Sequence, residues 1–196
     1  MGKYIAVFLD RDGTINEEVG YLDCLDKLKI IPAAYEAIRL INLSGVKAIV
    51  VTNQAGVARG FFTEKFVRQT HEILQTALLE EKASIDKFYY CPHHPAEGTG
   101  IYLQNCNCRK PLPGMLLQAA DDLDIELKSS YMIGDTCRDM ETAKKAGVKG
   151  ILVKTGYGRE ELLDVGADVA GSENKPDFIA EDILEAVKWI IKDRIK

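Results

Sequence analysis

Short, uninterrupted apolar runs separated by longer helix-like segments are the feature that most restricts how this chain can fold. Runs of this length that are apolar throughout are typical of strands buried on both faces of a parallel sheet. Five such runs occur, at residues 4–9, 47–51, 88–91, 131–133 and 151–153. Their alternation with helices predicts an α/β fold with a doubly wound, mostly parallel sheet of the Rossmann-like kind.

The segments between these runs carry helix start and stop signals. Pro32 can open the first helix and Gly45 follows its expected end, while Thr63 is a suitable N-cap for the second. The expected helices cover residues 32–42, 63–82, 113–123, 139–146 and 182–192. Because no repeat or interdomain linker interrupts this order, we predict a single domain that spans residues 1–196.

The net charge of the chain limits which kinds of partner it can bind. The chain carries 25 Lys and Arg residues against 30 Asp and Glu residues, a net charge of −5. Without a basic cluster we expect no nucleic-acid binding, which requires many phosphate contacts. No apolar run approaches the roughly 18 residues of a membrane span, and the N-terminus does not resemble a signal peptide. We therefore expect a cytoplasmic protein with no membrane partner and, since no coiled coil or exposed apolar stripe is recognised, a monomer.

Polar residues follow the expected strands, which is where ligands bind in an open α/β sheet. Each of these segments is common as a turn when it occurs alone, but together and in order they indicate an active site. The segments are Asp10-Arg11-Asp12-Gly13-Thr14, Thr52-Asn53-Gln54, Arg109-Lys110-Pro111 and Gly134-Asp135-Thr136-Cys137-Arg138-Asp139.

The residue types in these segments suit phosphoryl transfer. Asp10, Asp12 and Asp135 would repel one another in a dry cleft, and a hard divalent cation such as Mg²⁺ would relieve that repulsion. A carboxylate can attack phosphorus to form an aspartyl-phosphate, and a second carboxyl group nearby can act as acid and then as base. Lys110 and the Thr52 hydroxyl would stabilise charge on the transferring group.

Three of the five cysteines lie in a loop without periodicity that we expect to bind zinc, residues 91–110. Cys91-x-His93 and Cys106-x-Cys108 supply three thiolates and an imidazole, a set that suits tetrahedral Zn²⁺. Because protein fills all four positions, the zinc would be structural. His94 competes with His93 as the ligand. Clamping Cys108 would fix Arg109 and Lys110, the next two residues, over the site.

The four segments together resemble the haloacid dehalogenase superfamily of phosphotransferases over nearly the whole chain. The resemblance implies Asp10 as nucleophile, Asp12 as general acid and base, and Thr52 and Lys110 as phosphoryl-stabilising groups. It also implies Mg²⁺ held by the Asp10 carboxylate, the Asp12 main-chain carbonyl and Asp135. Asp139 would support these ligands from behind.

Longer stretches narrow the resemblance to the D-glycero-D-manno-heptose 1,7-bisphosphate 7-phosphatase family, which lacks a large cap domain. These stretches are residues 9–16, 52–60, 90–95 and 106–111. The resemblance raises the expectation of zinc and favours His93 as its ligand. It implies a cytoplasmic enzyme that supplies a precursor of ADP- or GDP-heptose for lipopolysaccharide or surface glycan. It further implies a substrate pocket formed by Arg11, Glu18, Val19, Gly20, Tyr21, Asn53, Gln54, Ala55, Arg109 and Thr136, the last of which is often Lys in this family.

Two alternatives remain open at this point. A histidinol-phosphate phosphatase, a near relative, would use the same groups. Arg109 favours a bisphosphate, because its planar fork offers two donors to a second phosphate. A protein of another class, a non-catalytic phosphoacceptor or partner-binding module, would need only one phosphorylated carboxylate, whereas here Asp12 follows Asp10 by two residues. The sequence does not distinguish the two anomers of the heptose.

Overall fold

The computed structural model describes residues 3–164 and 175–195, and its centre is a six-stranded sheet in which every strand pair is parallel. The strand order is β3-β2-β1-β4-β5-β6, so the chain reverses its direction of travel across the sheet between β1 and β4. The strands are β1 (Ala6–Leu9), β2 (Lys47–Asn53), β3 (Lys87–Cys91), β4 (Tyr131–Gly134), β5 (Lys149–Val153) and β6 (Phe178–Ala180). The predicted doubly wound parallel α/β fold is confirmed.

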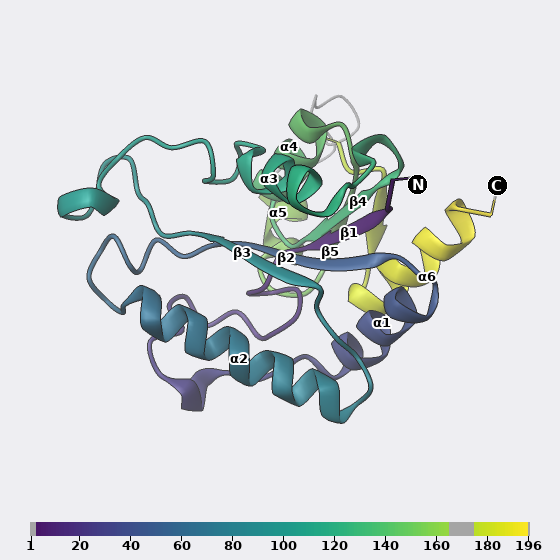
Figure 1. Cartoon of the computed structure of the whole chain (residues 1–196), viewed down its shortest axis with the longest axis horizontal. Coiled ribbons are helices and arrows are strands. Elements are labelled where there is room, and N and C mark those ends of the chain that lie inside the picture. Colours follow the sequence, from purple (N-terminus) through teal and green to yellow (C-terminus); the bar gives the residue numbers. More distant parts are fainter. Residues whose placement is uncertain (1–2, 165–174, 196) are drawn as a thin grey trace.

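Helices cover both faces of the sheet (Figure 1). One face carries α1, α2 and α6, and the other carries α3 and α4 with α5 beside them. The helices are α1 (Pro32–Leu43), α2 (Glu64–Glu80), α3 (Gly114–Leu123), α4 (Cys137–Ala146), α5 (Gly158–Asp164) and α6 (Ile183–Asp193). No large inserted domain is present among the described residues.

The alternating side chains of the strands divide the apolar core in two. On β1, Val7 and Leu9 pack towards α1, α2 and α6, whereas Ala6 and Phe8 pack towards α3 and α4. Because side chains of successive strand residues point to opposite faces, a strand buried on both faces must be apolar throughout. This requirement explains why the apolar runs in the sequence located the central strands.

The helix signals locate most helices to within two residues. Thr63 caps α2 by accepting a hydrogen bond from the Phe66 amide at 3.2 Å. Pro32 is the first residue of α1, and Gly45 lies beyond its end at a φ of 70°. Helix α4 begins at Cys137, two residues before the predicted start, because Thr136 and Asp139 form a capping box.

Two elements were missing from the prediction, α5 and β6. Strand β6 has three residues at the edge of the sheet, and Ile179 at its centre is exposed, so it lacks an uninterrupted apolar signal. Helix α5 has seven residues and begins at a glycine, too short for a clear periodicity. At the other end, Tyr4 was expected in the first strand but forms only an isolated bridge with Ile125.

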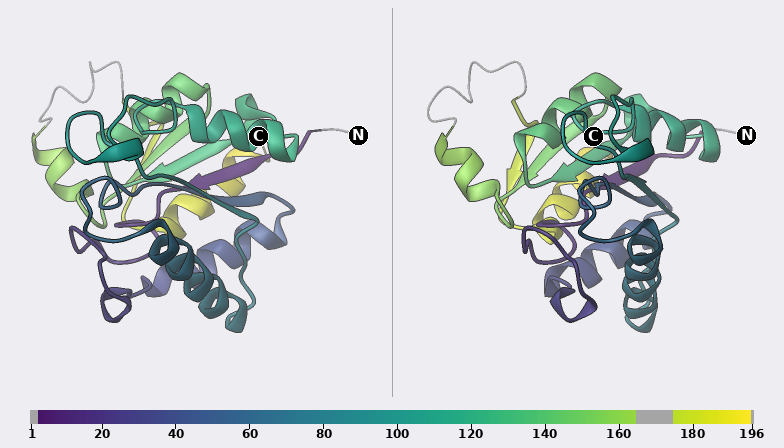
Figure 2. Two further views of the ribbon diagram at one scale, coloured as in Figure 1. Left: turned by 60° about the vertical axis from the view of Figure 1, so that its left-hand side comes forward. Right: turned by 90° about the vertical axis from the view of Figure 1, so that its left-hand side faces the viewer.

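The fold places the loops that follow β1, β2, β3 and β4 at one edge of the sheet, where the strands end. This edge faces the viewer in the right-hand view of Figure 2. The point between β1 and β4 is where successive connections leave in opposite directions, which is the usual ligand site of such a sheet. The acidic segments at residues 10–12 and 135–139 follow those two strands.

Candidate active site

Asp10 stands directly after β1 and is held in place by main-chain contacts. Its amide donates to the Ile133 carbonyl of β4 at 2.9 Å, which continues the sheet pairing beyond the last strand residue. Its Oδ1 accepts a hydrogen bond from the Arg11 amide at 2.7 Å. The carboxylate is therefore oriented by the backbone at the point where β1 and β4 diverge.

Lys110 joins two of the acidic side chains. Its Nζ lies 2.9 Å from Asp10 Oδ1 and 2.7 Å from Asp139 Oδ1, and it donates to the Val51 carbonyl at 3.0 Å. The Lys110 side chain is 2% exposed and that of Asp139 is fully buried. Burial lowers the pKa of Lys110, but the two carboxylates outweigh burial and raise it, so the ammonium stays charged.

The Asp10, Asp135 and Asp139 carboxylates form a cluster whose oxygens lie within 4.8 Å of one another. Burial is the main cause of a raised pKa for both Asp10, to about 7, and Asp135, to about 8, and the charges of the neighbouring carboxylates add to it. Lys110 opposes this shift but does not cancel it. A cluster with this excess of negative charge fits a divalent cation, which would favour the ionised carboxylates.

Two glycines leave room around Asp135. A Cβ on either Gly13 or Gly156 would lie 2.0 Å from Asp135 Oδ2, and both residues have a positive φ, 77° and 54°. The same Oδ2 accepts a hydrogen bond from the Tyr157 amide at 2.9 Å. The loop after β5 therefore closes on the acid cluster, and only glycine fits at the two closest positions.

Asp12 differs from the other acids because donors surround its carboxylate. Oδ1 accepts from Asn16 Nδ2 at 2.9 Å, and Oδ2 accepts from Gln54 Nε2 at 2.9 Å. Arg11 donates from Nε and Nη2 at 2.9 to 3.1 Å. Burial raises the pKa of Asp12, but the Arg11 charge and these hydrogen bonds outweigh burial and lower it. The two carboxyl groups at positions 10 and 12 thus have opposite pKa shifts, which is the arrangement expected for different chemical roles.

The loop after β2 positions neighbouring groups as well as lining the cavity. Gln54 Nε2 bridges Asp12 and Thr52 Oγ1, the latter at 2.9 Å. The Asn53 side chain accepts from the Lys110 amide at 3.0 Å and donates to the Lys110 carbonyl at 3.1 Å. Asn53 lines the cavity, yet both ends of its amide hold Lys110. Asn53 and Gln54 were predicted to bind substrate. In the structure their side chains also hold Lys110, and Asp12 and Thr52, respectively.

The side chain of Arg11 is buried, and the substrate contact implied for this residue stays a prediction. Its side chain is 1% exposed and makes a fork on Asp12 beneath the cavity surface. The carboxylate of the adjacent Asp12 occupies the guanidinium. The structure assigns the Arg11 side chain to positioning Asp12.

The acid cluster opens into a cavity of about 120 Å³. Nine of its twelve lining residues were sequence predictions for catalysis, metal or substrate, and Asp139 was predicted in support. Arg138, Tyr157 and Asp139 complete the wall together with Asp10, Asp12, Glu18, Gly20, Thr52, Asn53, Lys110, Asp135 and Thr136. Arg138 and Tyr157 were not among the predicted site residues. Arg138 lies in the quoted segment after β4, and Tyr157 lies in the loop after β5 at the same sheet edge, so the strand-end rule was the signal for both.

The remaining predicted pocket residues lie at the rim or below it. Tyr21 is half-buried, packs edge-on against Phe61 at 4.7 Å and accepts a hydrogen bond from Arg59. Arg59 also pairs with Glu97 of the zinc loop at 3.1 Å, so three loops are joined at this rim. Val19 is exposed and Ala55 is buried.

The four predicted zinc ligands converge in one cluster. Sγ–Sγ distances among the three cysteines are 3.0 to 3.5 Å, and His93 Nδ1 lies 3.4 Å from Cys108 Sγ and 3.8 Å from Cys91 Sγ. Tetrahedral zinc with Zn–S bonds of about 2.3 Å requires S–S separations of roughly 3.8 Å, so a small expansion of the cluster accommodates the ion. The donor set fits a structural zinc site.

His94, the competing candidate, lies outside the cluster of zinc ligands. Its Nδ1 accepts hydrogen bonds from the amides of Ala96 and Glu97, at 3.3 and 2.8 Å, so it stabilises the loop. Arg109 donates to the His93 carbonyl at 3.3 Å, and its guanidinium lies beside the cluster. Burial, together with the charges of Arg138 and Arg59, lowers the pKa of Arg109, which indicates that three cations gather near the zinc loop.

Removing one zinc ligand is expected to weaken both the fold of the loop and turnover. We expect Cys106→Ser to lose zinc, to lower the melting temperature and to reduce kcat by about 10- to 100-fold, because the segment holding Arg109 and Lys110 loses its anchor. Metal analysis, thermal melting and phosphate-release assays on one preparation measure all three effects. Cys24→Ser, a change at an exposed cysteine outside the cluster, is the matched control. Unchanged zinc content in Cys106→Ser would show that the cluster is not the binding site.

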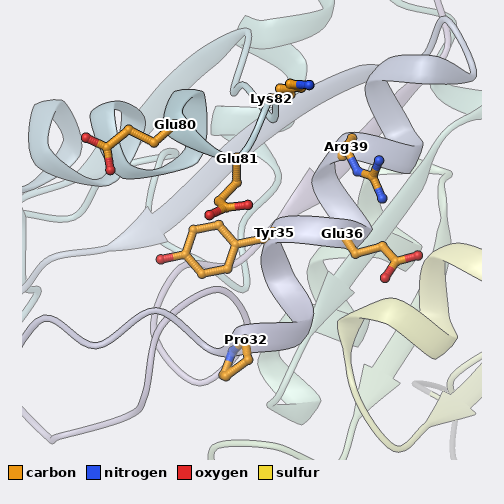
Figure 3. A pocket seen from close by; sticks show the side chains of 7 residues that line it. All are labelled: Pro32, Tyr35, Glu36, Arg39, Glu80, Glu81 and Lys82. Atoms are coloured by element: carbon orange, nitrogen blue, oxygen red, sulfur yellow. The ribbon is translucent and has the colours of Figure 1, made fainter.

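A larger hollow, of about 580 Å³, lies between α1 and the end of α2. Figure 3 shows Tyr35 and Glu81 beside each other in it, with Glu36 and Arg39 further along α1. It shares no residue with the acid cluster or the smaller cavity. Volume therefore does not identify the chemical site in this molecule; the clustered carboxylates and Lys110 do.

Comparisons with known proteins agree with this site. A protein-family model described as "HAD-hyrolase-like" matches residues 107–186, which include Lys110, Asp135 and Asp139. A crystal structure of D,D-heptose 1,7-bisphosphate phosphatase from B. bronchiseptica, complexed with magnesium and phosphate, superimposes with a TM-score of 0.83. It is 30% identical and covers 96% of this chain and 99% of that one. The protein is a haloacid dehalogenase-like hydrolase.

Curated relatives identify the family within that class. The chain is 45% identical to the D-glycero-beta-D-manno-heptose-1,7-bisphosphate 7-phosphatase of Pasteurella multocida, over 94% of this chain and 96% of the relative. The protein of the same name from Salmonella typhi is 44% identical over 96% of each chain. The chain belongs to the D-glycero-D-manno-heptose 1,7-bisphosphate 7-phosphatase family, which confirms the resemblance found in its sequence.

Proposed function

We propose that this enzyme removes the 7-phosphate of D-glycero-β-D-manno-heptose 1,7-bisphosphate through an aspartyl-phosphate on Asp10. The observation that carries the proposal is the ion-paired group formed by Asp10, Lys110 and Asp139, with Asp12 beside it in the same small cavity. The names of the relatives support the substrate and the anomer. The product keeps a phosphate on the anomeric carbon, the group that a later nucleotidyl transfer to ADP- or GDP-heptose would need.

In the first step, we assign Asp10 Oδ2 to the attack on the 7-phosphorus. Oδ1 is already engaged by Lys110 and by the Arg11 amide, which fixes the plane of the carboxylate. A P–O bond to Asp10 forms while the bond to the sugar oxygen breaks, and the proton on Asp12 passes to that oxygen. Lys110 and Thr52 Oγ1 stabilise the charge on the transferring phosphoryl group.

In the second step, water attacks the phosphorus of the aspartyl-phosphate and Asp12 accepts its proton. The bond between phosphorus and Asp10 breaks, which releases phosphate and restores the free carboxylate. The lowered pKa of Asp12 suits this step, since the resting side chain is ionised and ready to act as a base. Its acid role in the first step requires a higher pKa, which the negative charge of a bound substrate phosphate would supply.

The residues present fit a Mg²⁺ site. The Asp10 carboxylate, the Asp12 main-chain carbonyl and Asp135 would hold the ion. Asp139 supports them, because its Oδ2 accepts from the amide and hydroxyl of Thr136 at 3.1 and 2.6 Å while Oδ1 faces Lys110. When bound, the ion supplies positive charge that offsets the charge on the phosphoryl oxygens.

The stability of the metal-free protein should fall as the pH rises, and bound Mg²⁺ should remove that fall. The raised pKa values of Asp10, about 7, and Asp135, about 8, mean that folding favours the protonated forms. This contribution to stability is complete below the ordinary pKa of 3.8 and is lost as the pH rises from there through the folded values of about 7 and about 8. We expect the melting temperature of the metal-free protein to fall between pH 6 and pH 8.5, and saturating Mg²⁺ to remove the fall. A decline of equal size with and without Mg²⁺ would contradict this placement of the ion.

The position of cleavage is tested by the product. Phosphorus NMR of the reaction with the β anomer is expected to show inorganic phosphate and heptose 1-phosphate, with the anomeric phosphorus signal retained. Arg109 lies in the zinc loop, where the charge of Arg138 acts on it, and we assign these two cations to the phosphate that is kept. Loss of the anomeric phosphorus signal instead would show that the enzyme removes the 1-phosphate, which would contradict the proposed position of cleavage.

We further propose that the protein acts as a cytoplasmic monomer without nucleic-acid or membrane partners. Within residues 3–164 and 175–195, no helix is long and apolar enough to cross a membrane. The zinc cluster needs reduced cysteines, which a reducing compartment maintains. Sedimentation equilibrium in the presence of zinc is expected to give the mass of a single chain, 21.8 kDa.

A further inference from the structure

His71 lies in the middle of α2, inside the protein and outside the predicted catalytic set. It is 6% exposed, and its ring stacks on Phe88 of β3 with centroids 4.7 Å apart and meets Tyr90 edge-on at 5.8 Å. Packing alone would be served equally well by an aromatic hydrocarbon. A histidine here therefore needs a polar explanation.

The polar partner of His71 is Arg11. His71 Nε2 lies 3.4 Å from Arg11 Nη1, across 60 residues of sequence. The other nitrogens of the same guanidinium, Nε and Nη2, hold the Asp12 carboxylate. Because a guanidinium is planar and rigid, these contacts at its two ends fix its plane and hence the direction in which it grips Asp12.

The chemistry of the pair determines the state of the imidazole. A guanidinium only donates hydrogen bonds, so His71 Nε2 must accept, which places the ring proton on Nδ1 and leaves the ring neutral. Burial, with a further contribution from the Arg11 charge, lowers the pKa of His71 to about 3, consistent with a ring that stays neutral. A protonated ring would turn a second donor towards Arg11 and push it away.

We propose that His71 is a positioning residue for phosphoryl transfer, which holds the Arg11 guanidinium in the plane that orients the Asp12 carboxylate. The inference rests on the proposed function, because it assigns Asp12 the proton transfers. Asp12 also contacts Asn16 and Gln54, so the carboxylate would remain near its place without His71 but with a looser orientation. Misplacement of a proton-transfer group slows the chemical step more than it weakens substrate binding.

The test compares substitutions of one position. His71→Phe keeps the stack on Phe88 but removes the acceptor, and is expected to lower kcat for the β-heptose bisphosphate by about 10- to 100-fold with KM within about twofold. His71→Gln places an amide oxygen near the Nε2 position and is expected to restore kcat to within about threefold of wild type. His71→Asn, one methylene shorter, should behave like the phenylalanine variant and serves if that variant does not fold.

A control on the same helix separates positioning from packing. Thr70 is fully buried, and its hydroxyl donates to the Phe66 carbonyl at 3.0 Å without reaching Arg11. Thr70→Val is therefore expected to change stability but not kcat. Equal kcat in wild type, His71→Phe and His71→Asn would overturn the inference, as would a failure of His71→Gln to exceed His71→Asn.

A second readout does not depend on turnover. The Arg11 Nε–H signal in a nitrogen–proton NMR spectrum is expected to exchange with solvent about tenfold or more faster in His71→Phe, and to stay like wild type in His71→Gln. If wild type released no phosphate from the bisphosphate, the proposed function would fail and this signal would still decide the placement of Arg11. Identical exchange in all variants would overturn the positioning role of His71 and leave the proposed function standing.

Discussion

Replacing Asp10 with asparagine is expected to abolish phosphate release, by on the order of 10⁴-fold or more in kcat, while leaving the fold intact. The amide has the same shape as the carboxylate but cannot form the phosphorus–oxygen bond of the intermediate. The side chain lies at the end of β1 in a group of buried acids, so loss of its charge relieves repulsion. The melting temperature of the metal-free variant should equal or exceed that of wild type.

Steady-state release with Mg²⁺ and a thermal melt measure the two parts of this prediction. Asp23→Asn is the matched control, because Asp23 is exposed and forms an ion pair with the exposed Lys27 at 2.7 Å. That variant should turn over at the wild-type rate. Turnover at the wild-type rate in Asp10→Asn would remove Asp10 as the nucleophile.

Replacing Lys110 with methionine is expected to damage both catalysis and stability. Lys110 is the buried cation between Asp10 and Asp139, and it would stabilise the transferring phosphoryl group. Loss of such a group costs about 10²- to 10³-fold in kcat. Removing one partner of a buried ionic group also costs roughly 3–5 kcal/mol, because charge is left without compensation.

The stability cost of Lys110→Met should depend on pH. At pH 8 the ionised Asp10 loses its counter-charge, whereas near pH 6, below its pKa of about 7, Asp10 takes up a proton and the cost decreases. Urea unfolding at both values measures the difference, with Lys65→Met, at an exposed position of α2, as the control. Equal destabilisation at the two pH values, or kcat within twofold of wild type, would contradict the role assigned to Lys110.

The central fold and the acid cluster could be predicted because they follow from local patterns. Apolar runs mark strands buried on both faces, and the strand-end rule brings Asp10, Asp135 and Lys110 together. The structure confirms that arrangement of residues, and the comparisons confirm the family. The chemical roles of the individual residues stay predictions until the variants are measured.

What could not be predicted depends on contacts between distant parts of the chain. The resemblance implied a substrate contact for Arg11, whereas the burial of its side chain and its contact with His71 arise only when α2 packs on the sheet. The sequence also gave no means of seeing that the Asn53 side chain holds the Lys110 backbone, since 57 residues separate them. Long-range polar pairing of this kind carries no periodic signal.

The sequence pattern also does not decide between the alternative functions and substrates. The phosphoacceptor alternative requires a long-lived phosphorylated carboxylate, whereas Asp12 stands beside Asp10 as an ionised base at rest. Histidinol phosphate and the heptose bisphosphate would meet the same acid cluster. They differ in the second phosphate, which would lie towards the cations near Arg109 rather than at the reacting centre.

The most direct test measures kcat/KM with Mg²⁺, side by side, for the two anomers of D-glycero-D-manno-heptose 1,7-bisphosphate and for histidinol phosphate. We expect the β anomer to exceed each of the others by about a hundredfold or more, which corresponds to roughly 2.7 kcal/mol of transition-state stabilisation. A preference of that size for histidinol phosphate would contradict the proposed substrate while leaving the roles of Asp10, Asp12 and Lys110 unchanged. The absence of phosphate release from all three would contradict the proposed function itself.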